Sequence, residues 1–104
     1  MELQEYDLAI RAYKKLKDFC GLENESLHHL RMKAHEQISV CYGAAGYYNV
    51  AITYLKKALQ MSYLLRDHVS ELQYYDKLSR EYGNAGNPVK MVEYHKRAFE
   101  GLVE

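Results

Sequence analysis

The stretch YGAAGYYNVAITYLKKA, residues 42–58, returns in altered form as YGNAGNPVKMVEYHKRA at residues 82–98. Aligned without gaps, the two stretches are identical at seven of seventeen positions. Unrelated segments of this length would share about one position at ordinary residue frequencies. The chain of 104 residues therefore contains an internal repeat with a period of forty residues.

The repeated stretch has the periodicity of an amphipathic helix. One face carries residues at steps of four, three, four and three: Ala51, Leu55, Ala58, Ser62 and Leu65. This spacing matches 3.6 residues per turn, and the small residues at its start let a neighbouring helix approach closely. In the second copy the same positions hold Met91, His95, Ala98 and Leu102. His95, which replaces Leu55, is expected to be a packed histidine with a hydrogen-bond partner.

Start and stop signals divide the rest of the chain into helices. Gly46 and Gly86 fit the left-handed residue that closes a helix. Asp67 and Asn87 fit the N-cap position, and Pro88 suits the first helical position. We therefore expect five helices, at about 3–19, 25–45, 48–65, 68–85 and 88–103. In the fourth we expect an inward apolar stripe of Val69, Leu72, Tyr75, Leu78, Tyr82 and Ala85.

The order of these helices predicts the architecture. Short turns make neighbouring helices antiparallel, and a helix pair recurring about every forty residues is typical of an α-solenoid. The helix at 3–19 fits the second helix of a pair. We predict an all-α fold, an α-solenoid of antiparallel helix pairs with about two and a half repeats. Residues 1–104 are expected to form one domain of a longer protein.

At these positions the sequence resembles the tetratricopeptide repeat, whose pattern is W-x₂-L-G-x₂-Y, then A-x₃-F, then P. The first copy supplies Ile38, Ser39, Tyr42, Gly46, Tyr48, Ala51, Leu55 and Ala58. The second supplies Leu78, Ser79, Tyr82, Gly86, Met91, His95 and Ala98. The chain departs from the pattern because His35 and Tyr75 stand where Trp is usual and the closing proline is absent.

The spacing also departs from the family, because it is forty residues rather than thirty-four. That longer spacing, with the pair Tyr94-His95, resembles the variant found in Pins-type G-protein-signalling scaffolds and kinesin light chains. The resemblance covers about 36–104 well and the first helix weakly.

The resemblance implies a protein-binding function. In the family, stacked helix pairs form a concave groove, lined by the first helix of each pair, that takes a peptide or helix of a partner. On the groove-lining positions this sequence has Lys33, Glu36, Val40 and Ala44, then Gln73, Asp76, Arg80 and Asn84. Arg80 is the main candidate, because a guanidinium binds a carboxylate through two hydrogen bonds. The alternative is a solvated or salt-bridged arginine.

The carboxylate clamp of the chaperone-binding members of the family looks absent. The Asn position of that clamp holds Val40 and Arg80 here. We therefore expect a scaffold or adaptor whose ligand is not a chaperone C-terminal tail.

A second hypothesis is self-association. The ends of a solenoid normally need a polar capping helix. The last expected helix instead keeps more apolar residues than one packed face uses: Met91, Val92, Tyr94, Phe99 and Leu102. The terminal helices would then stack on a second copy of the chain.

The tyrosines are assigned to packing. Tyr42, Tyr54, Tyr82 and Tyr94 recur in register, which favours packed rings with a wet hydroxyl end. The pairs Tyr47-Tyr48 and Tyr74-Tyr75 each place one ring on a more exposed side, where it could anchor a partner.

Composition argues against other classes of function. The formal net charge is zero with acids and bases interspersed, so nucleic acid is not an expected partner. The sequence has no run of about eighteen apolar residues, so we expect no membrane-spanning segment. The start, MELQEYDLAI, lacks the layout of a secretory signal. Cys20 and Cys41 form no CxxC pair and read as reduced thiols of a cytoplasmic protein.

We expect no metal site, no cofactor and no enzyme activity. His28 and His35 on one helix lie about 10 Å apart along its axis, too far to share one zinc ion. The metal motif HExxH is broken, since Ser39 stands where its second histidine should be. No nucleophile elbow, glycine-rich phosphate loop or Cys-His signature occurs.

Overall fold

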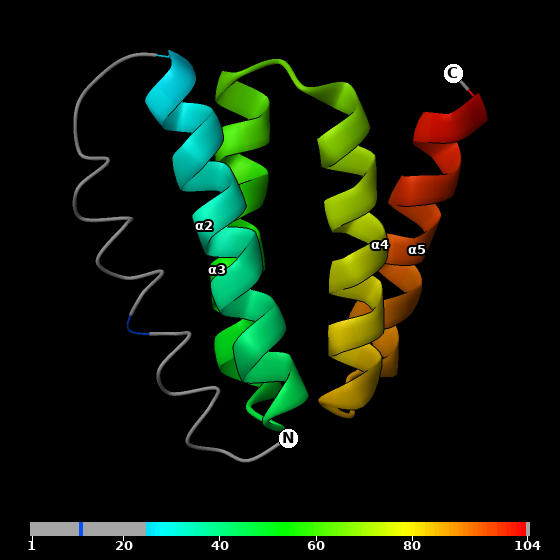
Figure 1. Ribbon diagram of the computed structural model, residues 1–104. Helices are drawn as coiled ribbons and strands as arrows, with labels where there is room; N and C mark the ends of the chain where they lie inside the picture. The colour runs from blue at the N-terminus through cyan, green and yellow to red at the C-terminus, as the bar shows by residue number, and fades with distance from the viewer. Residues whose placement is uncertain (1–10, 12–24, 104) are drawn as a thin grey trace.

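A computed structural model of the chain describes residue 11 and residues 25–103 (Figure 1). Residues 25–103 form four α-helices and no strand. The helices are α2 (Glu25–Ala44), α3 (Tyr48–Leu64), α4 (His68–Asn84) and α5 (Pro88–Val103). The predicted all-α class is confirmed for this part of the chain. The helix expected at 3–19 lies outside the described residues, except for Arg11, which is helical.

Each described helix packs against its neighbour in the chain: α2 on α3, α3 on α4, and α4 on α5. Consecutive helices are antiparallel, and their bounds lie within one residue of the ranges expected from the sequence (Figure 1). The core residues come from all four helices: Met32, Ile52, Leu55, Ala58, Leu59, Met61, Tyr74, Leu78 and Tyr94. None of the described helices is long and apolar enough to cross a membrane.

The three turns between these helices are built alike. Three residues separate one helix from the next, and the second of the three is here called the central residue. In each turn, the N–H groups of the central residue and of the residue after it donate to carbonyls in the last turn of the preceding helix, at 2.9–3.1 Å. These two bonds form a Schellman motif, which needs a left-handed central residue. The central residues are Gly46 (φ 89°), Arg66 (φ 54°) and Gly86 (φ 81°). The structure thus confirms the two predicted glycine turns and adds a third, occupied by an arginine.

Both predicted N-caps are present. The Asp67 carboxylate accepts hydrogen bonds from the N–H (3.1 Å) and the hydroxyl (2.7 Å) of Ser70. The hydroxyl bond, followed by the backbone bond, lowers the pKa of Asp67. Asn87 accepts from the N–H of Lys90 at 3.1 Å. These contacts satisfy backbone donors that the first turn of a helix leaves unpaired.

The two helix pairs repeat the same contacts between side chains. Tyr42 stacks on Tyr54 with ring centroids 5.8 Å apart, and Tyr82 stacks on Tyr94 at 5.5 Å. A third ring joins each stack, His35 in the first pair and Tyr75 in the second, with centroids 6.0 and 6.1 Å away. The packing role predicted for the repeated tyrosines is therefore confirmed.

A buried hydroxyl binds the second helix of each pair in the same way. Ser39 donates to the carbonyl of Ala51 at 2.8 Å, and Ser79 donates to that of Met91 at 2.7 Å. The forty-residue repeat of the sequence is therefore also a repeat of packing.

Three residues on the apolar faces expected from the sequence are exposed: Val69, His95 and Leu102. Val69 is 68% exposed, because it lies five residues before the buried Tyr74 and so about 140° around the helix from it. His95 is exposed as well, although its counterpart Leu55 is buried. Leu55 lies under α4, whereas within 25–103 no helix follows α5 to cover His95.

Candidate partner-binding pocket

The residues predicted to line a groove lie on α2 and α4, the first helices of the two pairs. All of these predicted residues except Glu36 are exposed: Lys33, Val40, Ala44, Gln73, Asp76, Arg80 and Asn84. Glu36 is buried, with 8% of its surface exposed. The structure thus places Glu36 in the contact between the helix pairs and the others at the surface.

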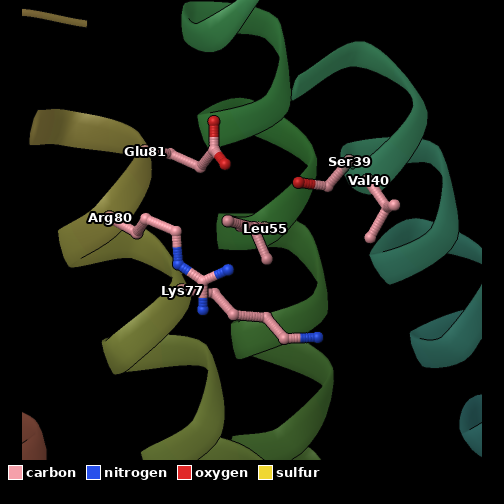
Figure 2. Close-up of a pocket in the computed structure, with 6 residues that line it drawn as sticks. All are labelled: Ser39, Val40, Leu55, Lys77, Arg80 and Glu81. Carbon is pink, nitrogen blue, oxygen red and sulfur yellow. The ribbon is translucent and has the colours of Figure 1, made fainter. Parts of the chain in front are cut away.

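Val40 and Arg80 line one pocket of about 200 Å³ (Figure 2). The neighbouring positions on α2 and α4 contribute to its walls, and α3 contributes an apolar side chain. The full set is Ser39, Val40, Leu55, Lys77, Arg80 and Glu81. Val40 and Arg80 occupy the same position of the two repeats, and they line the same pocket.

The other predicted residues do not line this pocket. Gln73 and Asp76 line a depression between α4 and α5. Asn84 lines a third, beside Tyr47 and Tyr48 at the end of the molecule. Lys33 lies 3.7 Å from Glu36, on the solvent side of that carboxylate. Five of the predicted groove residues are thus distributed over three hollows, and Lys33 and Glu36 line none of these three.

The guanidinium of Arg80 is almost unengaged. Among the residues that the structure describes, it pairs with Asp76, one helical turn earlier, at a long 3.9 Å and with both side chains more than 60% exposed. Such a surface pair contributes little to stability. Figure 2 places the side chain on the α4 wall beside Lys77, extended toward α3. Its donors are therefore available to an acceptor on a ligand.

Lys77, in contrast, is already paired. Its ammonium donates to Oε1 of Glu36 at 3.1 Å, and the Tyr74 hydroxyl donates to Oε2 at 3.0 Å. Burial by itself would raise the pKa of Glu36, but the hydrogen bond and positive charge of Lys77, aided by Tyr74 and Lys33, hold it below its ordinary value. Glu36 is therefore ionised at neutral pH and offsets the charge of Lys77.

Glu81 closes the pocket on the side of α2. Its Oε2 is buried without a hydrogen-bond partner, and the carboxylate packs so closely on Gly43 that a Cβ there would lie 3.1 Å from Oε2. Burial raises the pKa of Glu81, and the charge of Arg80 opposes this only in part. The pocket thus has a cationic side at Arg80 and a poorly solvated acid at Glu81.

This arrangement suits a ligand with one apolar group and one acceptor. Val40 offers half-exposed apolar surface, Leu55 lies almost buried at the base of the pocket, and Arg80 offers N–H donors beside them. Among the described residues, no group of three His, Cys, Asp or Glu side chains could hold a metal ion. Cys41 is a free, buried thiol whose pKa is raised by burial, which makes it a poor nucleophile.

The sequence did not predict that Tyr74 and Lys77 would bind Glu36, or that Glu81 would line the pocket; of the pair Tyr74-Tyr75, Tyr74 is the buried ring. The repeat itself could have predicted the contacts of Tyr74 and Lys77 with Glu36. Glu36 lies 38 residues before Tyr74 and 41 before Lys77, close to the period of forty, which puts these residues at one level on neighbouring helices. The repeat gives no such prediction for Glu81, because its counterpart one period earlier is Cys41.

Comparison with known proteins gives no match: no protein-family model, no curated protein and no solved structure is significantly similar to the chain. Function is therefore inferred from the repeat and from the geometry of the pocket.

Proposed function

We propose that this chain is a protein-interaction module of the tetratricopeptide type, an α-solenoid segment that binds a peptide or helix of a partner protein. Its role would be that of a cytoplasmic scaffold or adaptor. The support is the repeated pair of helices, with equivalent turns, ring stacks and serine contacts forty residues apart. Repeats of this kind present a preformed surface, so a peptide binds without ordering the module first.

The observation that carries the proposal is the convergence of Val40 and Arg80 on one pocket. Its volume of about 200 Å³ is below the roughly 300–1,000 Å³ of sites that enclose small-molecule ligands. A space of this size takes a single side chain of a larger ligand. That favours a protein or peptide over a metabolite.

The charges select the kind of peptide. Lys77 is neutralised by Glu36, so Arg80 is the cation available to a ligand. A carboxylate on Arg80 would form charge-assisted hydrogen bonds, while a neighbouring apolar side chain covers the half-exposed Val40. Glu81 repels a second acid on its side of the pocket. The preferred ligand is thus a segment with an apolar residue next to an acidic one.

Selection from a random displayed peptide library tests this function. The immobilised 104-residue chain is expected to enrich peptides that pair an apolar with an acidic residue. A synthetic copy of an enriched peptide, measured by fluorescence anisotropy, should bind Arg80→Glu at least about tenfold more weakly, which corresponds to about 1.4 kcal/mol. Val40→Asp should also weaken binding, because it places an acid against the ligand's acid.

Lys96→Glu is a matched control. Lys96 also pairs with an acid one turn away at 3.9 Å and is similarly exposed, but it does not line the pocket. It should leave peptide affinity unchanged. Equal affinity of Arg80→Glu and the wild type for every enriched peptide would rule out this pocket as the binding site.

A further inference from the structure

Helix α5 has a second apolar face, on the side away from the core. The inner side of the helix carries the buried Tyr94 and Ala98. The outer side, here called the α5 outer face, consists of Val89, Val92, His95, Phe99 and Leu102. Its apolar members are 60–75% exposed. A helix at the surface of a globular protein normally has one apolar stripe, so this second face needs an explanation.

The chain itself shows how the equivalent face of α3 is used. Forty residues before Val92, His95, Phe99 and Leu102 stand Ile52, Leu55, Leu59 and Ser62. These four are 1–6% exposed, and α3 packs there against α4. The same face of the helix therefore packs against a neighbouring helix in α3 and is exposed in α5.

The α5 outer face is complementary to itself. Toward its C-terminal half, a depression of about 290 Å³ lies between α4 and α5, lined by Leu72, Ala98, Phe99 and Leu102 among others. Toward its N-terminal half, Val89 and Val92 stand out from the helix, with 75% and 60% of their surface exposed. If two copies meet with their α5 helices antiparallel, the valines of each lie over the depression of the other.

The charges permit this pairing. The α5 outer face contains no Asp, Glu, Lys or Arg. The depression is also lined by Asp76 of α4, which has its own counter-charge in Arg80 at 3.9 Å, so two identical faces meet without burying an unpaired charge. Lys96 at its edge faces Glu100 of the same helix at 3.9 Å. Val92, His95, Phe99 and Leu102 follow steps of three, four and three, the spacing at which two helices pack side by side.

We propose that the α5 outer face binds the same face of a second copy of this chain, forming a two-fold dimer with antiparallel α5 helices. A two-fold interface is isologous, so Val92 of one copy packs near Leu102 of the other at both ends. The face is about 20 Å long, which makes the contact small. The dimer is therefore weak, in the micromolar range or above. The pocket at Arg80 lies elsewhere and stays open in the dimer.

Sedimentation equilibrium of the full chain, over a wide range of concentrations, tests the dimer. The wild type is expected to shift from monomer to dimer as concentration rises, and Phe99→Glu should weaken the dimer at least about tenfold. Leu64→Glu is the control, because Leu64 is 70% exposed but lies at the end of α3. A wild type that is monomeric at every concentration overturns the proposal, and so does equal weakening by both variants.

A charge swap tests the antiparallel register. Val92→Lys and Leu102→Glu should each weaken self-association, and an equimolar mixture should associate more tightly than either variant alone. Both positions are exposed, so circular dichroism should show unchanged helix content. A mixture that associates no better than the separate variants contradicts the proposed packing. Val40→Asp changes the pocket on α2 and not the depression between α4 and α5, so it should leave the dimer intact. The dimer and the peptide-binding function can therefore fail independently of each other.

Discussion

The Tyr74 hydroxyl on α4 donates a 3.0 Å hydrogen bond to Glu36 on α2, which joins the two helix pairs through a buried acid. Tyr74 is fully buried, and burial together with the adjacent Glu36 raises its pKa, so the hydroxyl remains a donor. Lys77 supplies the second donor to the same carboxylate. Helix α4 thus satisfies a charge that α2 could not bury by itself.

Tyr74→Phe is expected to destabilise the protein by about 1.5–3 kcal/mol, the range for a hydrogen bond to a charged group. Because phenylalanine keeps the packing of the ring, the loss of unfolding free energy measures the contribution of the hydroxyl group. Urea unfolding followed by circular dichroism measures it. Tyr63→Phe serves as a comparison, because the Tyr63 hydroxyl bonds that of Tyr75 at 2.7 Å in an exposed position. A smaller loss in Tyr74→Phe than in Tyr63→Phe would contradict this account.

Glu36 should make stability depend on pH in the acid range. Because its pKa in the folded state is lowered, its contribution is present above its unfolded value of about 4.3 and is lost as pH falls through the folded value. Glu36→Gln should be less stable than the wild type at pH 7, and the gap should narrow below about pH 4. Thermal unfolding at a series of pH values measures the gap. Glu100→Gln is the control at an exposed position, and its stability should stay close to that of the wild type at every pH.

Glu81 should affect the pH dependence of stability in the direction opposite to Glu36. Burial raises its pKa in the folded state, so its favourable contribution is present below its unfolded value of about 4.3 and is lost as pH rises through the folded value. Glu81→Gln is expected to stabilise the protein at pH 7, by up to about 1 kcal/mol, because no donor satisfies the buried Oε2. The same pH series should show the advantage disappearing near pH 4. A destabilised variant at pH 7 would mean that the carboxylate has a favourable role in the fold.

Local rules and the repeat predicted most of the described fold. The caps Asp67 and Asn87 and the turn glycines act through their own backbone neighbourhood, so a single sequence is enough to place them. Val69 and His95 were misplaced because burial depends on which helix lies alongside, and periodicity within one helix does not contain that information.

The pocket was predicted in part. Val40 and Arg80 were expected to line a concave groove from the first helix of each pair, and the structure places both of them at one pocket. Glu36 was assigned to the same surface because it shares their helical phase. It is buried because Tyr74 and Lys77 reach it from α4, a pairing that depends on contact between helices. Glu81 is part of the site because it packs on Gly43, a contact between α4 and α2 that neither helix predicts alone.

Arg66 is expected to be a site of strain, because it has the left-handed φ of 54° at a position where the other two turns have glycine. A side chain in this conformation costs about 1 kcal/mol, which glycine avoids. Arg66→Gly should therefore raise the free energy of unfolding by about 0.5–1 kcal/mol, measured by urea titration. Arg66→Ala separates this effect from loss of the guanidinium, since alanine keeps a Cβ and should give no gain. If alanine stabilises as much as glycine, the arginine side chain and not the backbone is the source of the cost.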